Sequence, residues 1–172
     1  TVPIGTNDKV ERIINEHRKD RGNILVASNP EFLAQGTAVE NTLHASRIVL
    51  GVEERTAKDT LLELYKDFDA PKLVMNRRSA EMVKYASNDF LALKISYINE
   101  IANLCEEIGA DIRDVTRGMG YDSRIGNEFL KAGIGYGGSC FPKDTKALHW
   151  LSSMHDRELK TIKAAIEVNE QQ

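Results

Sequence analysis

The first third of the chain alternates between helical and strand-like hydrophobic patterns. Apolar residues three and four positions apart predict a helix over residues 8–18, with Asn7 as its N-cap. A second helical pattern covers residues 56–68. Short apolar runs predict three strands, at residues 24–27, 47–52 and 72–75. Strands that alternate with helices indicate a parallel sheet in a Rossmann-like layer.

From residue 79 onward the pattern is helical. Residues 79–108 contain no proline or glycine and predict one long helix that ends at Gly109. Shorter helices are predicted at residues 112–119, 142–154 and 157–170. The predicted architecture is therefore the α/β end of a Rossmann-like parallel sheet, residues 1–76, followed by an all-α domain with one long helix, residues 77–172.

The composition is that of a globular protein, with 41% hydrophobic and 28% charged residues. No apolar run approaches the roughly 18 residues that would span a bilayer. A net charge of −3 without a basic run argues against nucleic-acid binding. The cysteines and histidines lack the spacing of a zinc site, so we expect no metal, and we expect no disulfide between the two cysteines.

A glycine-rich segment leads to a single cysteine. Residues 133–138 match GxGxxG, but no clear strand precedes them. Close approach of the backbone to a ligand explains these glycines better, although a plain surface loop remains an alternative. Pro142 fits the first position of a helix, which would place Cys140 just ahead of the helix N-terminus. Free N–H groups favour a thiolate there, so the pattern predicts a covalent nucleophile.

The long helix carries one apolar stripe. Its members alternate four and three positions apart: Leu91, Ile95, Ile98, Ala102 and Cys105. The stripe extends back to Asn88 and Lys84, where a charge is costly unless it is paired. Lys84 therefore either faces a substrate or is solvated where the helix leaves the core, whereas we expect Cys105 to be a core residue.

Two carboxylates are further candidates. Asp144 falls in the first turn after Cys140, where it could stabilise the helix dipole or polarise a water or lysine beside the thiol. Glu31 follows the first predicted strand, at the sheet edge where open α/β sheets bind ligands, with a solvated loop position as the alternative.

Together these residues resemble the nucleotide-sugar 6-dehydrogenases of the UDP-glucose/GDP-mannose dehydrogenase family over nearly the whole chain. The motifs that carry the resemblance are SNPEFL at 28–33, AEMVKY at 80–85 with Asn88, RIGN at 124–127, FLKA at 129–132 and GYGGSCFPKD at 135–144.

The resemblance implies that a primary alcohol is oxidised to a carboxylate, with NAD as cofactor. UDP-glucose is the favoured substrate, and GDP-mannose or a UDP-N-acetylhexosamine is the alternative. By resemblance, Cys140 forms a thiohemiacetal and then a thioester. Lys84 would stabilise the oxyanion, or share proton transfer with a water held by Asp144, and Asn88 would donate a second hydrogen bond to the oxyanion. Glu31 would act as base in thioester hydrolysis.

The resemblance also implies binding residues and partners. The substrate contacts would be Phe32, Leu33, Ala34, Phe129, Leu130, Lys131, Ala132, Gly133 and Gly137. Thr1 and Lys143 would contact the cofactor, and Arg124 would reach the substrate of a neighbouring subunit in a cytoplasmic homodimer built on the long helix. The family's N-terminal NAD fingerprint and C-terminal domain are not in this sequence, so we expect a central portion of such an enzyme. A dimerisation module without activity is the alternative.

Overall fold

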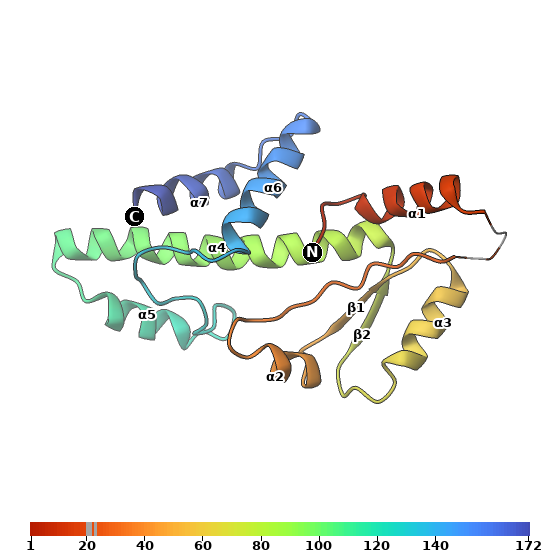
Figure 1. Ribbon diagram of the computed structural model, residues 1–172. Coiled ribbons are helices and arrows are strands. Elements are labelled where there is room, and N and C mark those ends of the chain that lie inside the picture. The colour runs from red at the N-terminus through yellow and green to blue at the C-terminus, as the bar shows by residue number, and fades with distance from the viewer. Residues whose placement is uncertain (20–21, 23) are drawn as a thin grey trace. The chain divides into compact units, whose positions relative to one another are not determined.

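Two units, Thr1–Lys84 and Tyr85–Gln172, make up the computed structural model, which describes residues 1–19, 22 and 24–172 (Figure 1). The first unit contains α1 (Thr6–His17), α2 (Ala38–Leu43), β1 (Ile48–Gly51), α3 (Arg55–Leu64) and β2 (Lys72–Met75). Helix α4 (Arg77–Ile108) begins in the first unit and ends in the second. The second unit also contains α5 (Ile112–Gly120), α6 (Phe141–Met154) and α7 (Lys160–Gln171).

The sheet of the first unit is a parallel pair. β1 and β2 are in register from Ile48 opposite Lys72 to Gly51 opposite Met75, and α3 forms the connection between them. All four residues of β1 are buried, as expected for a strand covered on both faces. The predicted Rossmann-like α/β arrangement of this region is confirmed.

The strand predicted at residues 24–27 is wrong. Ser28 alone pairs with Gly51, in an antiparallel bridge of 2.8 and 2.7 Å hydrogen bonds. The carbonyl of Val26 instead accepts a hydrogen bond from the Arg77 guanidinium. The glycine at position 51 lets both Ser28 and α4 lie close to β1, because a Cβ there would lie 3.0 Å from the Cβ of Ser28 and 2.6 Å from the Cβ of Ala80. Glu31 consequently follows a segment antiparallel to β1, and its prediction at the carboxyl edge of a parallel sheet is also wrong.

The N-terminus of α1 is capped from another element. Asn7 lies inside the helix, so its prediction as the N-cap is wrong, and the N-cap is Gly5. The backbone N–H groups of Gly5 and Asn7 donate to the two carboxylate oxygens of Glu81, at 2.6 and 3.0 Å. A buried carboxylate from α4 therefore satisfies the free N–H groups that a local side chain was expected to satisfy.

The other helices differ from the predictions mainly at their ends. Pro142 occupies the second position of α6, because the helix begins at Phe141. Helix α7 begins at Lys160, later than the predicted residue 157, and the short helix α2 was not predicted. Gly109 has φ +74°, as expected of a residue that ends α4.

In the second unit, fewer residues of the predicted α4 stripe are buried than expected. Ile98 and Cys105 are buried, which confirms Cys105 as a core residue, but Leu91, Ile95 and Ala102 are only half-buried. Besides Ile98, the most buried residues of this part of α4 are small or polar: Asp89, Ala92, Ser96 and Asn99. Small side chains let α7 approach, and Ser96 Oγ donates to the carbonyl of Ala165 at 2.7 Å.

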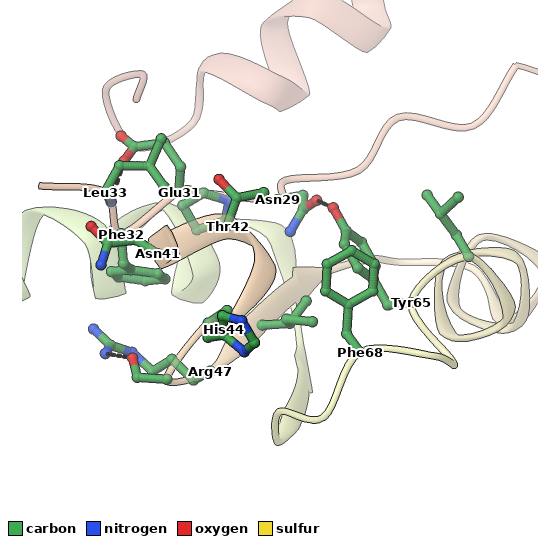
Figure 2. A pocket seen from close by; sticks show the side chains of 15 residues that line it. Asn29, Glu31, Phe32, Leu33, Asn41, Thr42, His44, Arg47, Tyr65 and Phe68 are labelled. Atoms are coloured by element: carbon green, nitrogen blue, oxygen red, sulfur yellow. Dashed lines mark hydrogen bonds between the residues drawn. The ribbon is translucent and has the colours of Figure 1, made fainter. Parts of the chain in front are cut away.

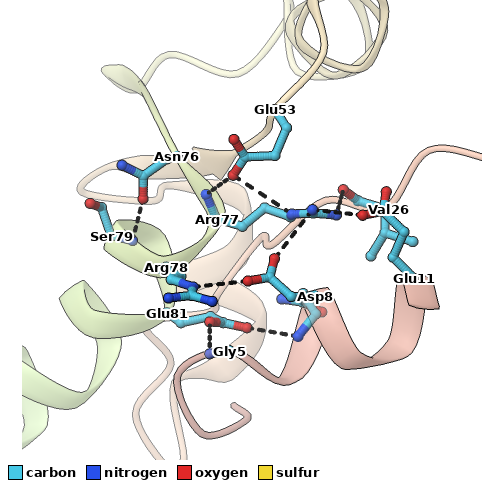
Figure 3. A network of polar contacts seen from close by, with 11 residues as sticks. Gly5, Asp8, Glu11, Val26, Glu53, Asn76, Arg77, Arg78, Ser79 and Glu81 are labelled. Carbon is cyan, nitrogen blue, oxygen red and sulfur yellow. Dashed lines mark hydrogen bonds and ion pairs between the residues drawn. The ribbon is translucent and has the colours of Figure 1, made fainter. Parts of the chain in front are cut away.

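A buried arginine joins several segments of the first unit. The Arg77 side chain, which is 7% exposed, lies 3.2 Å from Asp8 and 2.7 Å from Glu11, both in α1, and 3.7 Å from Glu53 beyond β1 (Figure 3). Glu53 also accepts the backbone N–H of Arg77 at the start of α4. One guanidinium thus links the ends of α1, β1 and α4.

Replacement of Arg77 by Met should destabilise the protein by roughly 3 kcal/mol, because three carboxylates lose their shared buried cation. The matched control is Arg78→Met, since Arg78 is 71% exposed and pairs only at the surface with Asp8. That variant should lose less than about 1 kcal/mol. Urea unfolding followed by circular dichroism measures both, and equal losses would contradict the role given to Arg77.

Candidate active site

Cys140 ends the glycine-rich loop at the start of α6. It is the N-cap residue of this helix, its thiol is free, and the residue is exposed. Its carbonyl accepts the first helical hydrogen bond, from the N–H of Asp144 at 2.8 Å. An accessible thiol is therefore held at the positive end of a helix, the position that the sequence predicted for it.

The glycine-rich loop is anchored by side chains from α4 and α7. Asn169 accepts the N–H of Tyr136 at 2.6 Å and donates to its carbonyl at 3.1 Å. Asn99 accepts the N–H of Gly133 at 2.8 Å, and Gln172 donates to the carbonyl of the same residue at 2.9 Å. Gly135 has φ +93°, and a Cβ there would lie 2.6 Å from the Asn169 side chain. These anchors hold the loop that leads to Cys140, so the plain surface loop is the weaker interpretation.

A buried hydrogen bond joins α4 to α6. Asn88 Nδ2 donates to Asp144 Oδ2 at 2.7 Å, and both residues are buried. Asp144 Oδ1 lies 3.1 Å from the Nζ of Lys143, whose side chain is 54% exposed. Asp144 thus sits one helical turn after the thiol and is oriented by an amide and an ammonium group.

Lys84 and Glu31 form an ion pair in the first unit. Lys84 Nζ lies 3.2 Å from Glu31 Oε1, and the Lys84 side chain is only 4% exposed, so the solvated alternative for this lysine is wrong. Thr1 Oγ1 donates to the same carboxylate oxygen at 3.2 Å, and the N–H of Leu33 donates to the other at 2.9 Å. Burial raises the pKa of Glu31. The hydrogen bonds to Glu31 and the charge of Lys84 lower the pKa by a larger amount, so that it lies below its ordinary value. Glu31 is therefore ionised at neutral pH.

Two cavities adjoin this pair. One, of about 180 Å³, is lined by Thr1, Asn29, Glu81 and Lys84 among others. The other, of about 510 Å³, is bordered by Glu31, Phe32 and Leu33 and by the aromatic side chains of Tyr65 and Phe68 (Figure 2). Its polar groups come mainly from the segment 41–47.

Two predicted substrate residues of the first unit, Phe32 and Leu33, border the larger cavity, whereas Ala34 does not line it. The Arg47 guanidinium lies 3.9 Å from the centroid of the Phe32 ring, a cation–π arrangement. Leu33 is exposed, and the N–H of Ala34 donates to Asn41 Oδ1 at 2.8 Å. The side chain of Phe32 and the backbone of this segment are thereby fixed.

The predicted substrate residues of the second unit lie in the glycine-rich loop and in the segment that precedes it. Phe129 has φ +62°, and its ring makes an edge contact with that of Phe141 at 6.2 Å. The Leu130 side chain is buried, so only its backbone could contact a ligand. Lys131, Gly133 and Gly137 are exposed, and Ala132 is half-buried. Arg124 is also exposed and forms an ion pair with Asp122 at 2.6 Å.

Several polar residues of the site were not predicted from the sequence. Asn99 lies four positions after Ile95 and would have been included in a wider α4 stripe, but Asn169 and Gln172 gave no signal in the sequence. Asp89 lies beside Asn88, outside the predicted stripe, and is buried.

None of the helices in the described part of the chain has the length and hydropathy needed to cross a membrane. Within residues 1–19, 22 and 24–172, no three histidine, cysteine, aspartate or glutamate side chains cluster so that they could hold a metal ion. The absence of a metal stays a prediction.

Two family models match the chain. The NAD binding domain of the UDP-glucose/GDP-mannose dehydrogenase family matches residues 1–69, and the central domain of the same family matches residues 78–171. UDP-glucose 6-dehydrogenases YwqF and TuaD of Bacillus subtilis are 54% and 51% identical to it over 172 residues. The chain spans 39% and 37% of the lengths of these relatives.

Solved structures agree with the family models. A UDP-glucose dehydrogenase from Pyrobaculum islandicum matches 99% of the chain with a TM-score of 0.96 at 47% identity, and 40% of that structure is covered. A GDP-mannose dehydrogenase from Pseudomonas aeruginosa matches with a TM-score of 0.67 at 32% identity over the whole chain, which covers 41% of it. The chain therefore belongs to the UDP-glucose/GDP-mannose dehydrogenase family.

Proposed function

We propose that the protein containing this chain oxidises UDP-glucose to UDP-glucuronate, with NAD as the cofactor. The observation that carries the proposal is the exposed Cys140 thiol at the N-terminus of α6, one turn before the buried pair of Asp144 and Asn88. The identity to UDP-glucose 6-dehydrogenases supports UDP-glucose over the other nucleotide sugars.

Cys140 is the proposed nucleophile. NAD, when bound, supplies the acceptor for the hydride lost in each of the two oxidation steps. The Cys140 sulfur adds to the aldehyde carbon formed in the first step, and the aldehyde oxygen becomes the hydroxyl of a thiohemiacetal. Loss of a hydride and a proton from that adduct gives a thioester. Water then adds to the thioester, and the carboxylate leaves as the thiol reforms.

The polar residues have separate proposed roles. Lys84 and Asn88, one helical turn apart on α4, donate hydrogen bonds to the oxygen on which negative charge develops. Asp144 orients the hydrolytic water, and Glu31, held ionised by its donors, acts as the base in thioester hydrolysis. The Lys131 ammonium suits a diphosphate, and so do the backbone N–H groups of residues 131–137 other than those of Gly133 and Tyr136, which donate to Asn99 and Asn169.

For the cofactor, this chain offers two suitable contacts. The Lys143 ammonium is half-exposed and can pair with an anionic group, and the Thr1 hydroxyl borders the cavity that Lys84 also lines. We propose the cytoplasm as the compartment, which suits an enzyme whose two cysteines, Cys105 and Cys140, are free thiols.

The test of the chemistry is the number of NADH molecules released per UDP-glucose consumed by the complete protein. Two NADH are expected, and Cys140→Ser should reduce turnover by more than about 10³-fold because the covalent adduct is lost. Cys105→Ala, which removes the buried thiol, is the matched control and should remain active. A ratio of one NADH, or turnover that survives in Cys140→Ser, would contradict the proposal. Activity with GDP-mannose or a UDP-N-acetylhexosamine alone would reassign the substrate.

We also propose that the protein forms a homodimer through α4. Exposed apolar residues recur seven positions apart on this helix, at Phe90, Tyr97 and Leu104, with Ile108 one turn further. Such a stripe is typical of a helix that packs against a second helix. In this assembly Arg124, whose side chain is exposed, would reach the partner's substrate.

Leu104→Lys should shift the protein from dimer to monomer in sedimentation velocity, because a charge would enter the packed stripe. Glu106→Lys, an exposed change on the opposite side of α4, should leave the dimer intact. A dimer that persists in Leu104→Lys would place the interface elsewhere. A stable dimer without turnover would favour the alternative that the chain is a dimerisation module without catalytic activity.

A further inference from the structure

One residue of the glycine-rich loop has both of its backbone groups held by a single side chain. Asn169 of α7 accepts the N–H of Tyr136 through Oδ1 at 2.6 Å and donates from Nδ2 to the Tyr136 carbonyl at 3.1 Å. At Gly133, by contrast, Asn99 and Gln172 contribute one hydrogen bond each. The two hydrogen bonds between Asn169 and Tyr136, called here the Asn169 clamp, fix the peptide groups on both sides of Tyr136.

Gly135 leaves room for the Asn169 clamp. It has φ +93°, a left-handed conformation that glycine adopts without strain, and a Cβ there would lie 2.6 Å from Asn169 Oδ1. That oxygen is the atom that accepts the N–H of Tyr136. An alanine at position 135 would therefore displace the carboxamide from its hydrogen bond.

Tyr136 also contacts the residue that follows the thiol. Its ring is buried and makes an edge contact with the ring of Phe141, the first residue of α6, with 6.1 Å between the ring centroids. Cys140 lies directly before Phe141 in the chain. Tyr136 is thus fixed to α7 through its backbone and to the first turn of α6 through its side chain.

The three residues between Tyr136 and Cys140 have little packing of their own. Gly137, Gly138 and Ser139 are all exposed. Among the described residues, no atom lies within 4 Å of where a Cβ would stand at either glycine. The orientation in which this segment presents the Cys140 thiol therefore depends on its two ends, Tyr136 and the start of α6.

We propose that Asn169 is a positioning residue for the thiol. By holding both backbone groups of Tyr136, its carboxamide fixes where the Cys140 sulfur lies when it adds to the aldehyde carbon. Displacement of a reacting group by about 1 Å can cost roughly 10²-fold in rate, so a loop released at Tyr136 should slow this addition. The catalytic consequence rests on the proposed function, whereas the Asn169 clamp itself does not.

Hydrogen exchange of the complete protein, resolved to single amides by fragmentation mass spectrometry, tests the clamp without the chemistry. The Tyr136 amide should exchange slowly in the wild type, and both Asn169→Ala and Gly135→Ala should remove this protection. Ser96→Ala is the matched control, because it removes a hydrogen bond to α7 at Ala165, one turn before the clamp, and should leave Tyr136 protected. Equal exchange of Tyr136 in the wild type and in Asn169→Ala would overturn the clamp.

The UDP-linked aldehyde, the product of the first oxidation step, separates the positioning role from a general loss of structure. Its reduction by NADH takes up a hydride and a proton without the thiol, whereas its oxidation by NAD requires the Cys140 adduct. Asn169→Ala should lower the oxidation rate by roughly tenfold or more and leave the reduction rate within about twofold of the wild type. Cys140→Ser should show the same selectivity more strongly, and Ser96→Ala should change neither rate appreciably. Equal losses in both directions in Asn169→Ala, as weaker folding or substrate binding would cause, would overturn the role.

A double variant tests whether Asn169 acts through the clamp. Gly135→Ala combined with Asn169→Ala should oxidise the aldehyde no more slowly than Gly135→Ala alone, because the clamp is already broken in the single variant. A further loss in the double variant would mean that Asn169 acts by another route, and would overturn the proposal. An aldehyde that the wild type neither oxidises nor reduces would refute the proposed function instead, and the hydrogen exchange would still decide the clamp.

Discussion

Helix α4 buries polar side chains along its length, and four of them bond groups on other segments of the chain. Lys84 pairs with Glu31, Asn88 bonds Asp144, Ser96 bonds the backbone of α7, and Asn99 bonds the loop at Gly133. An unpartnered buried polar group costs on the order of 1–3 kcal/mol, and more when it is charged. Each unit therefore provides bonding partners for its part of α4, and two of these α4 groups, Lys84 and Asn88, are also proposed to take part in the chemistry.

The second unit holds Cys140, the proposed nucleophile, in a way that leaves its thiol accessible. The loop before Cys140 is fixed through its backbone by Asn99, Asn169 and Gln172, so the thiol itself remains free of packing. Helix α6 then fixes the separation between the thiol and Asp144. A thiol and a carboxylate one turn apart on one helix keep their spacing whatever ligand enters.

The first unit contains two buried charges that each have several partners. Arg77 has three carboxylates, and Glu81 has two backbone N–H groups at the start of α1. Removal of one member of such a network destabilises the protein, because the remaining charges lose their partner and stay desolvated. The segment 24–28 owes its course to this network and to its bridge with Gly51, rather than to strand pairing.

The sequence by itself determined the helices of the second half, the parallel pair β1 and β2, and the position of Cys140 at a helix start. These features depend on local periodicity, on proline and glycine, and on short spacings, all of which are visible in the chain. Only the tertiary structure decided that residues 24–27 do not form a strand, that Glu81 caps α1, and that Asp89 is buried. Those outcomes depend on which distant group satisfies a buried donor, acceptor or charge, and the residues on either side of a position in the sequence do not specify that partner.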